Sequence, residues 1–197
     1  MNKQIIITIG REFGSGGHLI AEKLAEKLNL PLYDKKMISE VAKASGMDAR
    51  VFEKYDEKPV NVLFSRTVNG HSNSMEDTIA EKQFDFLRKK AEAGESFIVV
   101  GRCAETIFKN NANAFHIFIL ADKEYKVKRI SEIYNISESE AIAKMYRHDK
   151  KRKVYHNRYS KGKWGDSRNY DLCVRSNALG VEKTVESLLD IIQKKFS

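Results

Sequence analysis

Three glycines gather at one corner of the chain where a backbone could hold an anion. Gly14, Gly16 and Gly17 follow an apolar run at residues 5–9 and precede an amphipathic stretch at residues 18–28. A glycine-rich turn between a strand and a helix presents free N–H groups at the positive end of the helix dipole, an arrangement that binds phosphate. A tight turn that needs glycine only for positive φ angles is the alternative. The phosphate interpretation predicts a site formed by Gly14, Ser15, Gly16, Gly17 and His18.

The same corner departs from the usual phosphate-loop motif, G-x-x-x-x-G-K-[ST]. That motif brings a lysine to the terminal phosphates and a hydroxyl to Mg²⁺, whereas Gly17 and His18 stand at those two positions here. Arg11 or a lysine of a distant basic segment could supply the missing charge, and Ser15 is the nearest hydroxyl. A dinucleotide-binding loop fits less well, because the third position of G-x-G-x-x-G falls on Leu19.

The basic segment is the second group of candidates, and it spans residues 147–163. It holds eight lysines and arginines against one aspartate, a net charge of +7, whereas the whole chain carries +8. Such a local concentration of charge suits a polyphosphate ligand at least as well as a nucleic-acid backbone. Guanidinium groups bind phosphate in a bidentate manner, which draws attention to Arg147 and Arg152. A solvated helix face is the alternative for the segment as a whole.

Two further polar residues mark the ends of predicted strands. Asp34 closes the short strand at residues 31–34, and Arg102 follows the strand at residues 97–100. Ligands of a parallel sheet bind beyond the carboxyl ends of the strands, where both side chains are expected. A helix N-cap is the alternative for Asp34, and a structural ion pair is the alternative for Arg102.

The elements that would position these residues alternate along the chain. Apolar, β-branched runs predict strands, and capping signals and 3.6-residue periodicity predict helices. The strands are expected at residues 5–9, 31–34, 97–100, 115–120 and 172–174, and the helices at 18–28, 36–45, a stretch ending at Gly94, 122–134, a stretch capped by Ser137 and Glu140, and a closing stretch from 181 to 192. Residues 56–74 are expected to be irregular. This order predicts one α/β domain over residues 1–197, with a five-stranded parallel sheet and helices on both faces.

Four strings, taken in order, resemble the cytidylate kinase-like family, a branch of the P-loop kinases. They are REFGSGG, LPLYDKKMI, VVGRCAE and YRHDKKRKVYHNRYSKGKWGDSRNYDLCVRSNALG. The resemblance covers nearly the whole chain. It implies a P-loop NTPase-type three-layer sandwich, a monophosphate-binding section at about residues 35–93 and a basic lid at about residues 147–168.

The resemblance also implies a reaction and roles for the candidate residues. The reaction is ATP-dependent phosphoryl transfer to a nucleoside monophosphate such as CMP, with ATP and Mg²⁺ as cofactors. We expect the transferred phosphate to be contacted by Arg11, Arg147, Lys150 and Arg152, and the acceptor by Asp34, Arg102, Asp149 and Arg158. No protein metal ligand is predicted.

The composition excludes several other classes of protein and of binding site. Cys103 and Cys173 are too few for a disulfide framework and too far apart for a zinc motif. No run approaches the roughly 18 apolar residues of a membrane span, and the first residues lack a signal-peptide pattern, so a cytoplasmic location is expected. The rival function is a non-catalytic nucleotide sensor or RNA-binding module, in which Tyr155, Tyr159 and Trp164 would stack on bases. Nucleotides are the expected partners, nucleic acid is the less favoured one, and oligomeric state is left open.

Overall fold

The computed structural model describes residues 3–34, 40–42, 46, 48, 50, 67–68, 71–72 and 74–197. The helix expected at residues 36–45 and the irregular segment expected at residues 56–74 lie largely outside these ranges, so both stay predictions.

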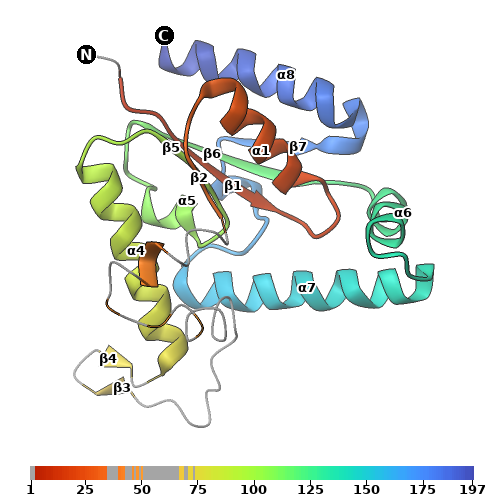
Figure 1. The fold of residues 1–197 in the computed structure, drawn as a ribbon, viewed down its shortest axis with the longest axis horizontal. Coiled ribbons are helices and arrows are strands. Elements are labelled where there is room, and N and C mark those ends of the chain that lie inside the picture. Colours follow the sequence, from red (N-terminus) through yellow and green to blue (C-terminus); the bar gives the residue numbers. More distant parts are fainter. Residues whose placement is uncertain are drawn as a thin grey trace.

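Five parallel strands form the central sheet, in the order β2-β5-β1-β6-β7 (Figure 1). They are β1 (Ile6–Arg11), β2 (Leu32–Tyr33), β5 (Phe97–Val100), β6 (Ala114–Leu120) and β7 (Leu172–Arg175). A separate antiparallel pair consists of β3 (Thr67–Val68) and β4 (His71–Ser72). β1 lies between β5 and β6 and is buried on both faces, which explains why its sequence is a continuous apolar run. The predicted five-stranded parallel sheet is confirmed.

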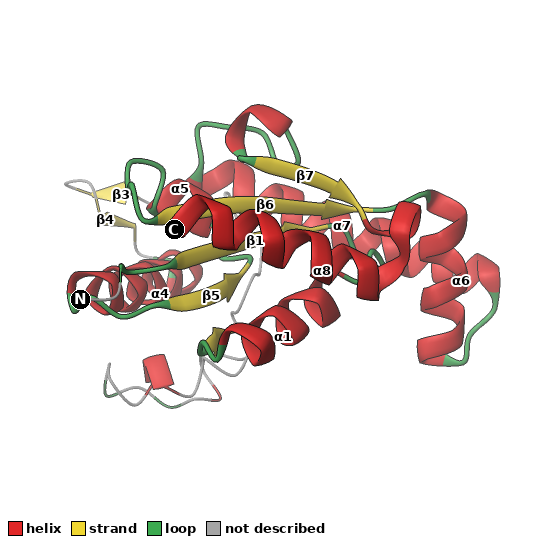
Figure 2. Cartoon of the chain, turned by 90° about the horizontal axis from the view of Figure 1, so that it is seen from above, coloured by secondary structure: helices red, strands yellow, loops and turns green. Residues whose placement is uncertain are grey.

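Helices cover both faces of this sheet, as Figure 2 shows from above. α1 (Gly17–Leu28) and α8 (Ser176–Phe196) pack on one face, against alternate strand residues such as Ile7 and Ile9. α4 (Met75–Glu92) and the short α5 (Ala104–Ile107) pack on the other face, against Ile6 and Val99. The helices on both faces expected from the alternation of strands and helices, and the three-layer sandwich implied by the family resemblance, are therefore confirmed.

A third pair of helices, α6 (Lys123–Tyr134) and α7 (Glu138–Tyr159), lies beside the sheet. Figure 1 shows α7 as one long helix that runs beside the sheet from α6 to α4. Its start is the predicted capping box: Ser137 Oγ accepts from the N–H of Glu140, and Glu140 Oε2 accepts from the N–H of Ser137. The short 3₁₀ helix η1 (Ser167–Asn169) leads from α7 to β7.

The residue at the N-cap position of α6 does not cap the helix with its side chain. Asp122 occupies the N-cap position, but its carboxylate makes no capping hydrogen bond. One oxygen accepts from Asn177 Nδ2 at 2.7 Å, and the other lies 3.2 Å from Arg175 Nη1. Because these partners belong to the start of α8 and the end of β7, Asp122 joins two corners of the fold instead of closing a helix end.

Candidate functional site

The glycine-rich loop, residues 12–17, joins β1 to α1 in the conformation that anion binding requires. Gly14 and Gly16 adopt left-handed φ angles of 86° and 80°, which turn successive N–H groups to one side. Within the described part of the chain, nothing accepts a hydrogen bond from the N–H groups of Gly14, Gly16 and His18. The loop is therefore open to an anion at the N-terminus of α1.

The hydroxyl of Ser15 is not part of that opening. Ser15 is fully buried, its Oγ donates to the carbonyl of Glu12 at 2.9 Å, and it accepts from the N–H of Gly17 at 3.3 Å. The side chain therefore shapes the loop from inside. It does not take the place of the hydroxyl that usually faces Mg²⁺. The backbone of Ser15 also has protein partners, because its N–H donates to the carbonyl of Glu12 at 3.4 Å and its carbonyl accepts from Ser176 Oγ at 2.5 Å.

A cavity of about 450 Å³ opens above the loop. Candidates from five parts of the chain line it: the loop itself, Arg11 at the end of β1, Asp34 after β2, Arg102 after β5 and Arg152 on α7. The sequence placed Asp34 and Arg102 at the carboxyl edge of the sheet because parallel strands end there together, and the structure brings both to one cavity with the loop. The charged residues of the lining are four arginines, Arg11, Arg102, Arg129 and Arg152, and three acidic residues, Glu12, Glu22 and Asp34. Guanidinium groups beside an open anion-binding loop suit a polyphosphate.

Arg102 is held by an unusual turn. Gly101, Arg102 and Cys103 have consecutive left-handed φ angles of 78°, 60° and 51°, which two of the three residue types rarely adopt and which costs free energy. The side chain is 2% exposed, and burial lowers the pKa of its guanidinium to about 10, with the charge of Arg11 acting in the same direction. Arg102 therefore remains charged at neutral pH, in a position that anions stabilise.

Asp34 faces the N-terminal end of α1. The residue is 7% exposed, and Oδ2 lies 3.4 Å from Nε2 of His18, which is also 3.4 Å from Oε1 of Glu22. The residues that Asp34 would cap begin at position 35, outside the described ranges, so the N-cap alternative stays open. No group of three His, Cys, Asp or Glu side chains in the described residues is arranged around a metal position.

The basic segment does not act as a unit, because α7 turns its residues to different sides. Arg152 lines the cavity, and its Nη1 donates to the carbonyl oxygen of Arg11 at 3.3 Å. Arg147 and Lys150 are exposed and do not line the cavity. Of the three cations predicted to contact the transferred phosphate from this segment, the structure brings only Arg152 to the loop.

The two acceptor-side candidates of α7 have protein partners. Asp149 Oδ1 accepts the N–H of Phe13 at 2.7 Å, and burial raises the pKa of the Asp149 carboxyl. Arg158 binds Asp77 of α4 through both Nε and Nη2. These contacts tie the glycine-rich loop and α4 to α7, so a closing movement of residues 147–168 stays a prediction.

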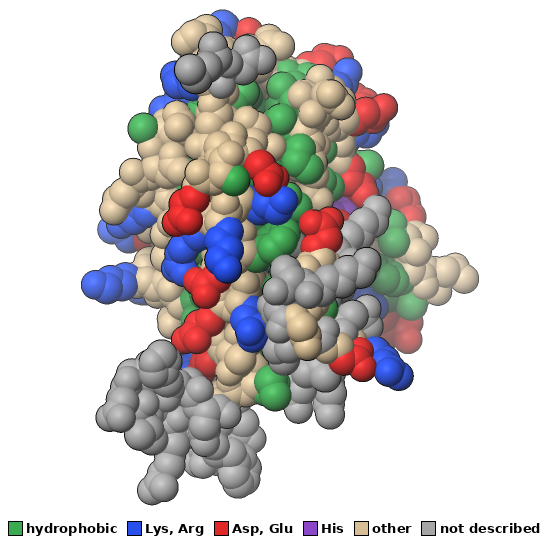
Figure 3. All heavy atoms as spheres, turned by 60° about the vertical axis from the view of Figure 1, so that its left-hand side comes forward, with side chains coloured by type: hydrophobic (Ala, Val, Ile, Leu, Met, Phe, Trp, Pro, Cys, Tyr) green, Lys and Arg blue, Asp and Glu red, His purple; other side chains and the backbone are tan. Residues whose placement is uncertain are grey.

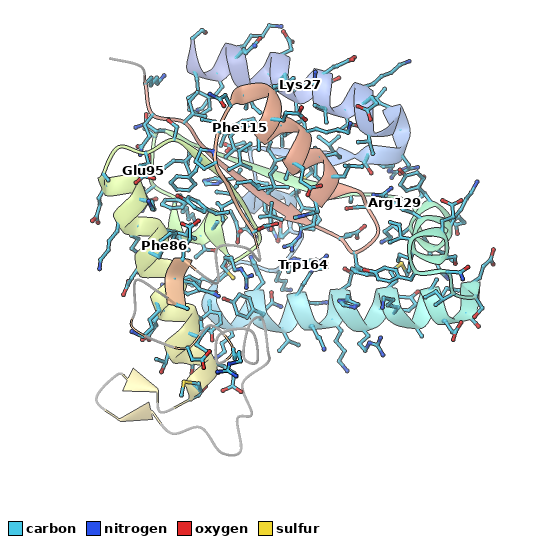
Figure 4. The ribbon with its side chains drawn as sticks, in the orientation of Figure 1. Lys27, Phe86, Glu95, Phe115, Arg129 and Trp164 are labelled. Atoms are coloured by element: carbon cyan, nitrogen blue, oxygen red, sulfur yellow. The ribbon has the colours of Figure 1, made fainter. Side chains whose placement is uncertain are left out.

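Sequence reasoning missed the contribution of α6. Arg129 and Tyr134 line the cavity together with Ile130, and Arg129 extends toward Gly16, where its Nε lies 3.9 Å from the position that a Cβ would take. Figure 4 labels Arg129 beside the strand-to-helix loop. Lys126 of the same helix binds Glu12 Oε2 at 2.8 Å. Arg129 is one of several basic residues in α6, and nothing in the sequence distinguishes it from the others.

The aromatic residues that an RNA-binding surface would need are used in packing. Tyr155 is 6% exposed, Tyr159 packs edge-on against Phe84, and Trp164 packs edge-on against Phe118. Figure 4 shows Trp164 between the sheet and α7. On the face drawn in Figure 3, basic and acidic side chains are intermingled instead of forming a surface of one sign. Among the described residues, no helix combines the length and the hydropathy needed to cross a bilayer.

Known proteins share this architecture. The model of the cytidylate kinase-like family matches residues 6–178. A cytidylate kinase from Methanocaldococcus jannaschii is 28% identical over 196 residues, which covers 96% of this chain and 100% of that protein. An uncharacterized protein from Eubacterium ventriosum, solved as a crystal structure, is 43% identical with a TM-score of 0.77, and the match covers 96% of this chain and 99% of that one.

A more distant match concerns the fold alone. A shikimate kinase from Bacteroides thetaiotaomicron is 14% identical with a TM-score of 0.55, and the match covers 96% of this chain and 98% of that one. The expected P-loop kinase fold is therefore confirmed. With a family match over most of its length, the chain belongs to the cytidylate kinase-like family.

Proposed function

We propose that this protein transfers the terminal phosphoryl group of ATP to a nucleoside monophosphate, with CMP as the first candidate acceptor. The observation that carries the proposal is the convergence of Arg11, Arg102 and Arg152 from three different elements on one cavity above an open glycine-rich loop. Family membership supports a kinase, and the similarity to a protein named cytidylate kinase supports the choice of CMP.

The donor phosphates fit the loop side of the cavity. The N–H groups of Gly14, Gly16 and His18 are available there, and the N-terminus of α1 adds a positive dipole. Arg129 and Arg11 flank the same end. The phosphates of ATP therefore contact the backbone N–H groups of the loop, and the terminal phosphate contacts guanidinium groups.

The acceptor fits the other side, between Asp34 and Arg102. Arg102 is buried at the cavity, so its charge is already in place when a phosphate arrives. Both residues follow neighbouring strands, since β2 pairs with β5. A monophosphate bound there faces a donor phosphate bound at the loop.

Phosphoryl transfer demands positioning and positive charge more than covalent chemistry. The arginines supply fixed charge where negative charge develops on the transferring group. Mg²⁺ binds through one or two carboxylates together with substrate phosphates, and Asp34 is the buried carboxylate of the cavity that fits this requirement. When bound, Mg²⁺ would neutralise phosphate charge.

The test is direct. The protein is incubated with Mg-ATP and a panel of nucleoside monophosphates, and diphosphate products are separated by ion-exchange chromatography. CMP is expected to give CDP and ADP in equal amounts, and Arg102→Ala is expected to abolish both. ATP binding without diphosphate formation from any acceptor would contradict the proposal and favour a nucleotide sensor.

A further inference from the structure

The glycine-rich loop lacks the lysine that its motif normally carries, and the structure indicates what replaces it. In the usual loop this lysine reaches the β- and γ-phosphates, but Gly17 occupies its position here. Without a cation at this point, three backbone N–H groups would face a highly charged triphosphate. A replacement charge must therefore come from a neighbouring element.

Position 17 requires glycine because a side chain would not fit there, and not because of its backbone angles. Gly14 and Gly16 have left-handed φ angles, whereas Gly17 does not and begins α1 as an ordinary helical residue. A Cβ built on Gly17 would lie 2.6 Å from Cβ of Arg11 and 3.2 Å from Cβ of Ile119. Both obstacles are carbons attached directly to the backbone of the central strands, so neither can move aside cheaply.

The residue that fills this space is a cation. Arg11 ends β1, lines the cavity above the loop, and also lines a second, smaller cavity with Arg102 and Arg152. Nε of Arg11 is buried, and no side chain or backbone group of the described residues accepts its hydrogen bond. Nε has almost no accessible surface, so a phosphate in the cavity contacts Arg11 through the part of the side chain that lines the cavity.

The other cations are less well placed for this role. Arg129 lines the cavity beside Gly16, but the atoms nearest to a Cβ on Gly17 belong to Arg11 and Ile119. Lys150 and Lys153 are exposed on α7 and do not line the cavity. Arg152 uses Nη1 to bind the carbonyl of Arg11. Arg102 follows β5 on the acceptor side. Arg11 is the cation whose own stem packs against the position of the missing lysine.

We propose that Arg11 and Gly17 form an exchanged pair: the charge has moved from the start of α1 to the end of β1, and Gly17 is required because the stem of Arg11 occupies the space of a side chain at position 17. Arg11 then contacts the terminal phosphates of the donor from the strand side. This inference rests on the proposed function for its turnover measurement, whereas its binding measurement does not depend on the acceptor.

A reciprocal exchange tests the pair. Three variants of the full chain are compared with the wild type: Arg11→Gly, Gly17→Lys, and the double variant Arg11→Gly/Gly17→Lys. Binding of inorganic tripolyphosphate is measured by calorimetry, turnover is measured with Mg-ATP and CMP, and thermal unfolding monitors folding. Lys153→Ala removes an exposed cation and serves as the matched control, with wild-type values expected.

Arg11→Gly is expected to weaken tripolyphosphate binding by about 10- to 100-fold, the effect of losing a charge-assisted hydrogen bond. Gly17→Lys alone is expected to bind no better than wild type and to unfold at a lower temperature, because its Cβ collides with Arg11. The double variant removes the 2.6 Å collision with Arg11, keeps the 3.2 Å approach to Ile119, and restores a cation. It should therefore bind at least about tenfold more tightly than Arg11→Gly. This rescue is the signature of an exchanged pair.

Two further variants separate space from charge if Gly17→Lys fails to fold. Gly17→Ala is expected to be destabilised by the collision alone. Adding Arg11→Gly should restore part of its thermal stability, because the 3.2 Å approach to Ile119 remains, and should not restore tripolyphosphate binding. The inference is overturned if Arg11→Gly binds tripolyphosphate like the wild type, or if the double variant is no better than Arg11→Gly.

The outcomes also separate this inference from the proposed function. A wild-type protein that forms no diphosphate but binds tripolyphosphate through Arg11 would refute the kinase activity and leave the exchanged pair intact. Normal CDP formation by Arg11→Gly would refute the exchanged pair and leave the kinase activity intact.

Discussion

The backbone N–H of Phe13 donates a hydrogen bond of 2.7 Å to Oδ1 of Asp149, 136 positions further along the chain. The bond connects the glycine-rich loop to α7, and the ring of Phe13 stacks on the imidazole of His148 with centroids 4.2 Å apart. The same helix carries Arg152, which lines the cavity. The position of the loop relative to this arginine is thus fixed by contacts outside the cavity itself.

Removing the Asp149 carboxylate, which accepts the hydrogen bond from Phe13, should destabilise the protein. Asp149→Ala leaves the Phe13 N–H without its acceptor, which costs about 1–3 kcal/mol of unfolding free energy. Asp149→Asn keeps an acceptor oxygen, and it also removes the cost of burying a charge, the factor that raises the pKa of this carboxyl. The Asp149→Asn variant should therefore lose clearly less unfolding free energy than Asp149→Ala, as measured by urea unfolding at pH 7. Equal losses would mean that the hydrogen bond contributes nothing.

The stacked imidazole predicts a pH dependence. Burial, followed by the positive charge of Arg152, lowers the pKa of His148 from 6.5 to about 4. The unfolded chain therefore takes up this proton at a higher pH than the native state does. The corresponding stability is fully present above pH 6.5 and is lost as the pH falls from 6.5 toward 4. Chemical unfolding at a series of pH values across this interval measures the loss.

The matched variant for this prediction is His148→Phe. It keeps an aromatic ring against Phe13 but cannot titrate, so its unfolding free energy should fall less steeply than that of the wild type between pH 6.5 and 4. If the two curves run parallel across this interval, other groups cause the acid sensitivity and the imidazole is not responsible.

Much of the scaffold follows from local sequence signals. The strand at β1 and the cap at Ser137 depend on residues close together in the chain, so they are readable without the fold. Asp34 and Arg102 were also found at the cavity, because the ends of parallel strands meet at one edge. The cation of α6, Arg129, was missed because its position above Gly16 depends on how two distant elements pack.

The basic segment illustrates a signal that was available but not used. Met145, Asp149, Arg152 and His156 are spaced by three or four residues, so they share one face of α7. Met145 and His156 are buried on that face, whereas Arg147 and Lys150 lie on others and are exposed. Counting charge alone treats all these cations as equal, whereas helical periodicity distinguishes Arg152 from its neighbours.

Arg158 is predicted to serve stability first. Its Nε lies 2.7 Å from Oδ1 of the buried Asp77, which also accepts from the hydroxyl of Tyr159 at 2.7 Å. Asp77→Ala should lower the unfolding free energy by about 3 kcal/mol, the low end for breaking a buried pair, because the Arg158 side chain is 33% exposed. Thermal and urea unfolding measure this.

A comparison variant separates this role from the acceptor contact expected from sequence. Arg158→Ala should also destabilise the protein, by less than Asp77→Ala, since the aspartate that remains keeps the hydrogen bond from Tyr159. An Arg158→Ala protein with wild-type stability but no CDP formation would instead show that Arg158 binds substrate.

The final prediction distinguishes two arginines of α7 that the sequence alone treated alike. Arg152 lines the cavity beside Arg11, whereas Arg147 is exposed five positions earlier. Removing a fixed charge that stabilises the transition state typically costs about 10²- to 10³-fold in rate, so Arg152→Ala should lower kcat/KM for CMP phosphorylation by about that factor. Arg147→Ala changes the same net charge at a site exposed to screening solvent and should change kcat/KM by less than about threefold.

Arg152→Lys tests geometry as well as charge, because an ammonium group cannot form the paired contacts of a guanidinium, and it should recover only part of the activity. Equal losses for Arg147→Ala and Arg152→Ala would mean that the segment acts through its overall charge, and that α7 presents a different face to the substrate during the reaction.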